Sequence, residues 1–230
     1  MAHSRNSPVQ FFMGCHPRYC FFILALLSVW GVDCMAQSVS YNLPELFSKG
    51  LIVGENRTVR ALNDKAVEVS EAEGYGVAWL QDVRFSNGTI EIDLRGKDVK
   101  QGSFLGIAFH GASKDTCEAI YFRPFNFLAT DSAQRSHMVQ YVFENKYGWE
   151  RLRNEHPGVY EGQVSPKTPP NEWFHVKIEV KEEIINVYTN NSNTPCLVVH
   201  SLNTVRTGNL GLWVGNTSAG EFAHLVVRHN

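Results

Sequence analysis

Short runs of alternating apolar and polar residues recur along most of this sequence, with Gly, Asn and Pro turn signals between them. Residues 89–95 (TIEIDLR) and 173–180 (WFHVKIEV) are the clearest, because every second side chain in them is apolar. A period of two is that of a β-strand with one buried and one solvated face. The only helical turn that we expect lies around residues 43–49. The chain is therefore predicted to fold almost entirely as β-sheet.

The other strand candidates are short and closely spaced, as in a sandwich or barrel. They lie at residues 66–70, 76–80, 104–110, 118–124, 137–143, 149–152, 184–189, 196–202, 209–215 and 221–228. No βαβ crossover pattern is present, which argues against a parallel sheet. Hydrophobic residues make up 43% of the chain, enough for a large core. We expect an all-β fold, a two-sheet antiparallel β-sandwich.

An export signal is predicted at the N-terminus. After a mildly basic stretch comes an apolar run of a dozen residues at 21–32 (FFILALLSVWGV). That length suits the core of a signal peptide, whereas a membrane-spanning helix needs about 20 residues. The small residues Cys34 and Ala36 then stand at the −3 and −1 positions of a cut before Gln37.

We therefore predict a signal peptide at 1–36 and a single domain at 37–230, with no membrane span in the mature chain. Two alternatives stay open for the N-terminus. A lipoprotein-type cut would make Cys34 the first residue, although Asp33 fits that position poorly. The apolar run could also be retained as a membrane anchor.

The cysteines and the net charge limit which metals and macromolecules the protein is expected to bind. Cys117 and Cys196 are the two cysteines of the predicted mature domain. In an oxidising compartment they form either a disulfide or two free thiols, and their spacing matches no zinc motif. We predict no metal or cofactor. The formal net charge of −2 supplies no basic surface for a phosphate backbone, so nucleic acid is not an expected partner.

Several of these runs, in this order, resemble the jelly roll of the concanavalin A-like lectin/glucanase superfamily. They are residues 89–96 (TIEIDLRG), 104–111 (FLGIAFHG), 118–124 (EAIYFRP), 172–180 (EWFHVKIEV), 184–191 (IINVYTNN) and 208–227 (GNLGLWVGNTSAGEFAHLVV). The pattern is similar to laminin G-like sandwiches and, among them, to secreted bacterial domains near the 3-keto-disaccharide hydrolases. The resemblance implies a carbohydrate partner and a secreted or periplasmic location in a bacterial cell envelope.

A glycosidase needs two carboxyl groups that flank the scissile bond. The glucanases of this superfamily carry Glu-x-Asp-x-x-Glu on one strand. Here Glu91 and Asp93 match the first two positions, but Gly96 stands in place of the last glutamate. That pair is therefore interpreted as the solvated face of a strand.

A second cluster, in the middle of the chain and near its end, has the composition of a sugar site. Aromatic rings stack on the apolar face of a sugar, and planar Arg and Gln groups pair with its hydroxyls. The candidate ligand-binding residues are His110, Tyr121, Arg123, Gln140, Trp149 and Trp213, with Glu118 as a candidate catalytic acid or base. Each has an ordinary alternative, such as a core aromatic, an edge ion pair or a turn cap.

Three functions follow, in order of preference. The first is a secreted carbohydrate-binding module that recognises a glycan in an aromatic- and Arg-lined groove. The second is a glycoside hydrolase of the 3-keto-disaccharide hydrolase type, and the third is a laminin G-like protein-adhesion module. Whether the protein is an enzyme stays open at this point.

Overall fold

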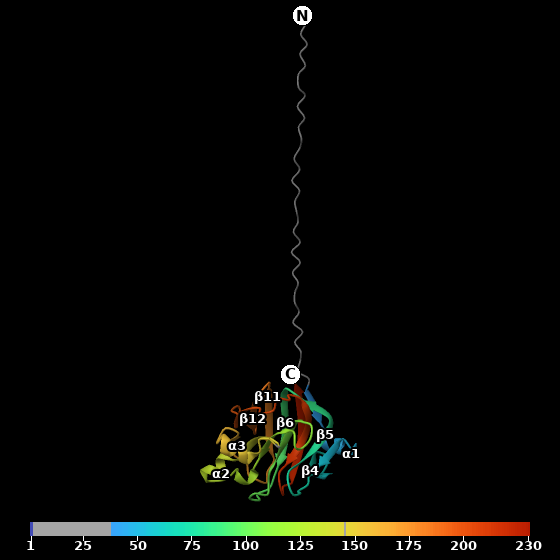
Figure 1. Cartoon of the computed structure of the whole chain (residues 1–230). Coiled ribbons are helices and arrows are strands. Elements are labelled where there is room, and N and C mark those ends of the chain that lie inside the picture. The colour runs from blue at the N-terminus through green and yellow to red at the C-terminus, as the bar shows by residue number, and fades with distance from the viewer. Residues whose placement is uncertain (2–37, 145) are drawn as a thin grey trace. The chain divides into compact units, whose positions relative to one another are not determined.

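In the computed structural model, residues 38–144 and 146–230 are described, together with Met1. The predicted signal peptide at 1–36 lies outside the described residues, so its cleavage and the domain boundary stay predictions. Within the described part the chain is dominated by strands (Figure 1). No helix in this part has the length and apolar character that crossing a membrane requires.

The elements follow the chain in a simple order. They are β1 (Ser38–Tyr41), α1 (Leu43–Ser48), β2 (Ile52–Glu55), β3 (Val59–Ala61), β4 (Ala66–Val69), β5 (Gly76–Phe85), β6 (Gly88–Arg95), β7 (Leu105–Gly111), β8 (Glu118–Phe122), the 3₁₀ turn η1 (Pro124–Asn126), α2 (Ser132–Ser136), β9 (Val139–Phe143), α3 (Trp149–Glu155), β10 (Glu161–Gly162), β11 (Phe174–Lys181), β12 (Ile184–Thr189), β13 (Leu197–His200), β14 (Gly208–Val214) and β15 (Gly220–His229).

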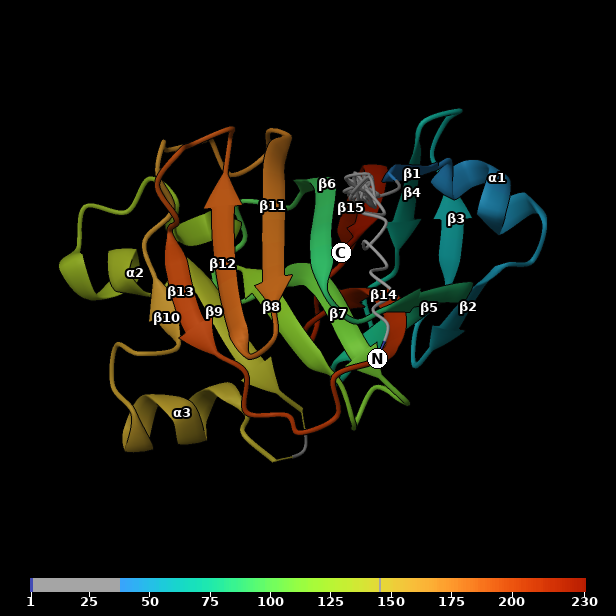
Figure 2. The same ribbon diagram turned by 90° about the horizontal axis from the view of Figure 1, so that it is seen from above.

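These strands form two antiparallel sheets, as the sequence predicts. One sheet has eight strands in the order β13-β12-β11-β6-β15-β4-β3, with β1 added beside β15. The other has seven, in the order β10-β9-β8-β7-β14-β5-β2. In Figure 2 the strands β11, β12 and β13 lie side by side in one layer, and β8 and β9 cross behind them. The expected β-sandwich is confirmed.

The alternating strands bury the faces that their sequences predict. The apolar side chains of β6 and β11 are almost fully buried and pair in register as Leu94–Phe174, Ile92–Val176 and Ile90–Ile178. The charged residues between them stay on the outer face of the eight-stranded sheet. The strands β11 and β12, which are joined by a short turn, pair antiparallel as a hairpin.

The helix predicted near residues 43–49 is α1. Asn42 caps it by accepting a hydrogen bond from the Glu45 backbone N–H at 3.1 Å, and Pro44 occupies its first turn. Both features favour a helix start, because the first N–H groups of a helix have no partner within it.

Residues 149–152 were predicted as a strand, and this is wrong. They begin α3, whose last turn carries the exposed ion pair of Arg151 with Glu155 at 2.9 Å, one turn apart. Glu, Arg and Leu favour a helix, and pairs four residues apart stabilise it. The alternation in WERL is too short to separate the two structures.

The two described cysteines are free thiols, which is one of the two alternatives left open. Cys117 is fully buried, and its Sγ donates to the Lys114 carbonyl oxygen at 3.3 Å. Cys196 is half-buried.

Candidate functional site

A groove of about 990 Å³ lies on the outer face of the seven-stranded sheet. On β8 the side chain of Phe122 points inwards and packs edge-on against Phe174 of the other sheet, with ring centroids 5.2 Å apart. Neighbouring side chains of a strand point to opposite faces, so Tyr121 points outwards into the groove. The groove is lined by Gly74, Tyr75, Lys100, Gln101, Phe104, Tyr121, Arg123, Phe125, Asn126, Gln134, His137, Val142, Glu144, Gly148, Trp149, Glu150, Arg151, Arg153, Trp213, Gly215 and Asn216.

One row of residues across the sheet builds the floor. Strand register places, from β5 to β10, Val77, Trp213, Gly106, Tyr121, Gln140 and Glu161 side by side. Gly106 stands between Tyr121 and Trp213, and a Cβ there would lie 2.5 Å from the Tyr121 Cα. Because Gly106 has no side chain, the two rings stack across it, with centroids 4.6 Å apart and planes 24° apart.

The Trp213 indole keeps an unused hydrogen-bond donor. Tyr75 lies on it with ring centroids 6.3 Å apart, and only 4% of Trp213 is exposed. Its Nε1 atom is buried and has no hydrogen-bond partner among the described residues. A buried N–H without a partner is costly, so this donor favours a ligand acceptor in the groove.

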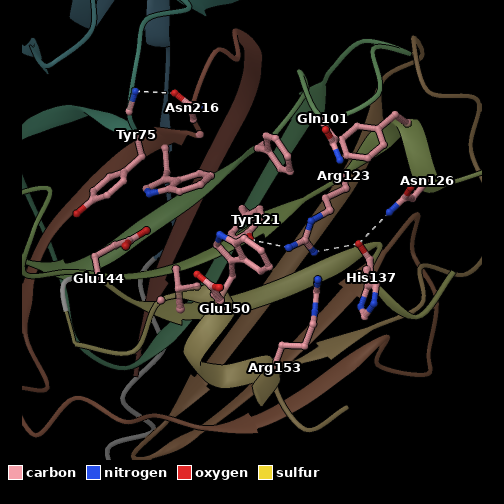
Figure 3. A pocket seen from close by; sticks show the side chains of 18 of the residues that line it. Tyr75, Gln101, Tyr121, Arg123, Asn126, His137, Glu144, Glu150, Arg153 and Asn216 are labelled. Atoms are coloured by element: carbon pink, nitrogen blue, oxygen red, sulfur yellow. Dashed lines mark hydrogen bonds between the residues drawn. The ribbon is translucent and has the colours of Figure 1, made fainter. Parts of the chain in front are cut away.

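Arg123 follows β8 and is held by three neutral acceptors. Its Nη1 donates to the His137 carbonyl oxygen at 3.0 Å, and its Nη2 donates to the Tyr121 hydroxyl at 2.7 Å and to the Gln140 Oε1 at 3.3 Å. Gln140 is itself oriented by donating to the Tyr141 carbonyl oxygen at 3.1 Å. Figure 3 shows Arg123 between Tyr121 and His137, with its hydrogen bonds to these two residues drawn.

Burial keeps the Tyr121 hydroxyl neutral. Burial raises the pKa of Tyr121 to about 12, although nearby Arg123 acts in the opposite direction. The phenol oxygen therefore accepts from Arg123 and still carries its own proton, which remains available to a ligand oxygen.

An ion-pair network forms one wall. Arg153 on α3 donates through Nε and Nη2 to both oxygens of Glu161, at 3.1 and 2.8 Å. The Nδ1 atom of His137 lies 2.7 Å from the same carboxylate, in an orientation that makes no hydrogen bond. Burial lowers the pKa of His137, against the pull of Glu161.

Trp149 is the exposed aromatic of the groove. It begins α3, is 47% exposed, and lies under the Arg153 guanidinium, 4.9 Å from its ring centre. A large ring with this much open surface can cover an apolar face of a ligand, and the cation above it holds its orientation.

A comparison with known protein-family models finds no match, and neither does a comparison with curated protein sequences. Solved structures do match. The carbohydrate-binding module CBM66 from Bacillus subtilis is 13% identical with a TM-score of 0.55, over 77% of this chain and 95% of the module. The fold is a concanavalin A-like jelly roll.

Two further structures share this jelly roll. One is a Bacillus subtilis protein with a galectin-like fold, 11% identical, with a TM-score of 0.55 over 84% of this chain and 98% of that one. The other is the exoplasmic/lumenal domain of VIP36 with bound Ca²⁺ and Man3GlcNAc, 10% identical, with a TM-score of 0.56 over 82% of this chain and 86% of that one. Among the described residues of the present jelly roll, no group of three or more His, Cys, Asp or Glu is placed to hold a metal ion.

The jelly roll brings together five of the predicted site residues. Tyr121, Arg123, Trp149 and Trp213 all line the groove, and Gln140 lies in its floor as a partner of Arg123. Gly211 and Gly215, which lie on either side of Trp213, do not open space for a ligand beside the indole. A Cβ at Gly211 would meet Val77 and Trp79, and one at Gly215 would meet Phe104, so neighbouring side chains fill both spaces.

Glu118 and His110 do not join them. Both are fully buried between the sheets, with the Glu118 Oε2 atom 2.7 Å from the His110 Nδ1 atom. Tyr141 donates to the other Glu118 oxygen at 2.7 Å. On β8, Glu118 shares the inward face with Phe122, so the sheet separates it from the groove. The position of Glu118 therefore gives no support to its expected catalytic role. The position of His110 likewise gives no support to the expected ligand contact.

Sequence reasoning missed part of the groove. Tyr75, Phe104 and Phe125 come from turns and strand ends, where no local pattern marks a surface aromatic. The charged residues Arg153 and Glu150 stand beside Trp149 in the sequence, so the local density of such residues was the one available signal.

Proposed function

We propose that this protein binds a glycan in the groove. The observation that carries the proposal is the Tyr121–Trp213 stack, whose buried indole N–H has no partner within the described residues. A groove that combines an exposed ring, Trp149, with side-chain donors such as Arg123 suits a sugar ring, which has an apolar face and a rim of hydroxyls. The fold shared with a carbohydrate-binding module and with the VIP36 domain that binds Man3GlcNAc supports this, although a fold by itself does not decide function.

The size and position of the groove agree with an oligosaccharide. Its volume of about 990 Å³ is at the upper end of that of small-molecule sites. Trp149 on α3 is 47% exposed, so a sugar ring bound in the groove finds an open aromatic face at that side. The polar groups are largely fixed by partners in the protein, which lowers the entropy lost on binding.

A glycan array followed by titration calorimetry tests the proposal. Trp149→Ala is expected to weaken binding about tenfold, because a sugar–aromatic contact is lost. Trp173→Ala is the matched control: Trp173 also lies under an arginine, Arg95, at 4.9 Å, but it does not line the groove. If the parent protein binds no glycan on the array, the proposal is overturned. Equal losses of affinity in Trp149→Ala and Trp173→Ala would overturn it as well.

Glycoside hydrolysis is a second candidate, favoured by one observation. The carboxylates of Glu144 and Glu150 both line the groove, and glycosidases use two carboxyl groups. The test is release of new reducing ends from a bound oligosaccharide. Turnover that is lost in Glu150→Gln, while binding persists, would assign hydrolysis; binding without any product would assign a binding module.

A further inference from the structure

Arg123 is a nearly buried cation whose charge is not neutralised. It is 6% exposed, yet no carboxylate of the described residues lies within ion-pair distance of it. Its three acceptors, the His137 carbonyl, the Tyr121 hydroxyl and the Gln140 amide, are all uncharged. A guanidinium carries more N–H donors than these contacts use, so some remain for a ligand.

The other arginines of the same wall differ from Arg123. Arg153 is neutralised by the two-fold hydrogen bond to Glu161, and Arg151 pairs with Glu155. Arg57 is also buried without a carboxylate, but its Nη atoms donate to the carbonyl oxygens of Asn56, Gly74 and Gly215, and it does not line the groove. Arg123 thus combines a buried, uncompensated charge with access to the groove.

The charged residues nearest Arg123 leave it without a carboxylate partner among the described residues, because Glu161 is paired with Arg153. Figure 3 shows Arg123, Arg153 and His137 gathered on one side of the groove, with Glu144 across Tyr121 from them. Arg153 and Arg123 both act to lower the pKa of His137, after the larger effects of burial and Glu161. Glu150 also lines the groove, but it is exposed on the first turn of α3, where water solvates its charge.

We propose that the glycan is anionic and that its carboxylate or sulfate group binds Arg123. This rests on the proposed glycan binding and adds the chemical class of the ligand. A buried charge is costly unless it is paired, and the fold has already oriented this guanidinium through Tyr121 and Gln140. The planar fork of N–H donors matches the oxygens of such a group, and a charge-assisted hydrogen bond in a nearly dry site is strong.

The first test changes only the ligand. The protein is titrated with oligogalacturonate and with its methyl ester, which is the same saccharide without the charge; a sulfated and an unsulfated galactan form the second pair. The charged member of at least one pair is expected to bind about tenfold more tightly or better. The pair that shows the difference identifies carboxylate or sulfate as the group. Added salt is expected to reduce that difference.

The outcomes separate the two proposals. If only neutral glycans on the array bind the protein, the anionic ligand is refuted and glycan binding stands. The same holds if the charged and uncharged saccharides of both pairs bind equally well. If no glycan binds, both proposals fail.

A second test changes the protein. Arg123→Lys keeps the charge but loses the fork, and is expected to reduce affinity for the charged saccharide about tenfold while leaving affinity for a neutral one. Arg60→Lys is the control, because Arg60 donates to both oxygens of a carboxylate, Glu68, but does not line the groove. Thermal unfolding of both variants shows whether the protein is folded at the temperature of the titration. Equal affinity of Arg123→Lys and the parent protein for the charged saccharide would overturn the assignment.

Discussion

The ring of Tyr121 stacks on that of Trp213 at a centroid distance of 4.6 Å, across a strand on which the facing residue is Gly106. The two residues are distant in the sequence and meet only because β8 and β14 both flank β7. The contact packs two nearly buried rings into the floor of the groove, and its consequences for binding and stability can be measured.

The hydroxyl and the ring of Tyr121 are expected to contribute separately to glycan affinity, and two substitutions distinguish them. Tyr121→Phe keeps the stack but removes an acceptor of Arg123, so we expect roughly three- to tenfold weaker glycan binding, corresponding to the loss of one hydrogen bond of about 1 kcal/mol. Tyr121→Ala also removes the ring and is expected to weaken binding further. Calorimetric titration of the two variants with one oligosaccharide measures this order. Tighter binding by Tyr121→Ala than by Tyr121→Phe would contradict the stacking role.

Gly106 is expected to tolerate no side chain. In Gly106→Ala the new Cβ would meet the Ile120 carbonyl oxygen and the Tyr121 Cα on the neighbouring strand. The free energy of unfolding should fall by about 1–3 kcal/mol, because overpacking forces the strands apart. Denaturant unfolding measures this, with Gly148→Ala as a control, since a Cβ there meets nothing within 4 Å. If Gly106→Ala is as stable as the parent protein, β7 and β8 can separate enough to accept a side chain at this position.

The Glu118–His110 pair is expected to act on stability and not on binding. Glu118→Gln replaces the buried carboxylate that contacts His110 and accepts from Tyr141, so the free energy of unfolding should fall by about 1–3 kcal/mol. Under conditions where the variant is folded, its glycan affinity should equal that of the parent protein, because the sheet lies between Glu118 and the groove. A loss of affinity or turnover without a loss of stability would return Glu118 to the functional site.

A charged cluster on the eight-stranded sheet predicts a stability optimum. The hydrogen bond to Asp93 raises the pKa of His175, so its stabilisation is complete below the ordinary value of 6.5 and is lost as pH rises through the raised value. Burial raises the pKa of Asp93, but hydrogen bonds from His175 and His224 outweigh this and hold it below 3.8. Its stabilisation is present above pH 3.8 and is lost as pH falls through the lowered value.

Stability should therefore be greatest between about pH 4 and 6 as far as this cluster contributes. His175→Asn should flatten the decline above that range by less than about 1 kcal/mol, because the groups are partly exposed. His200→Asn, an exposed histidine 3.7 Å from Glu183, is the control. Thermal unfolding as a function of pH measures both, and the same profile in the parent protein and His175→Asn would contradict the assignment.

The two described thiols are expected to be inert in the folded protein. Burial raises the pKa of Cys196 to about 12 and that of Cys117 still further, so almost no thiolate exists at pH 8. Alkylation followed by peptide mapping should find both cysteines unmodified before unfolding and fully modified after it, without added reductant. Recovery of a peptide pair linked through Cys117 and Cys196 would show a disulfide instead.

The strands β6 and β11 illustrate what local pattern predicts well. Their strict alternation identifies Ile92 and Val176 as inward residues, and the register pairs them directly. The four residues at 149–152 show the limit of this method, since WERL fits a strand as well as the helix it adopts. The alternation within residues 118–124 also predicts that Tyr121 and Arg123 share one face, and both line the groove.

Sequence by itself determined the all-β class and the alternating inner faces, because a period of two is a local property of the chain. It also supplied the residue types of the proposed glycan site. Only the tertiary structure decided which of those residues meet. It stacks Trp213 on Tyr121, buries Arg123 with no carboxylate partner among the described residues, and places Glu118 in the interior. The physical reason is that strand order and register set these distances, and both depend on how all the strands bury their apolar faces at once.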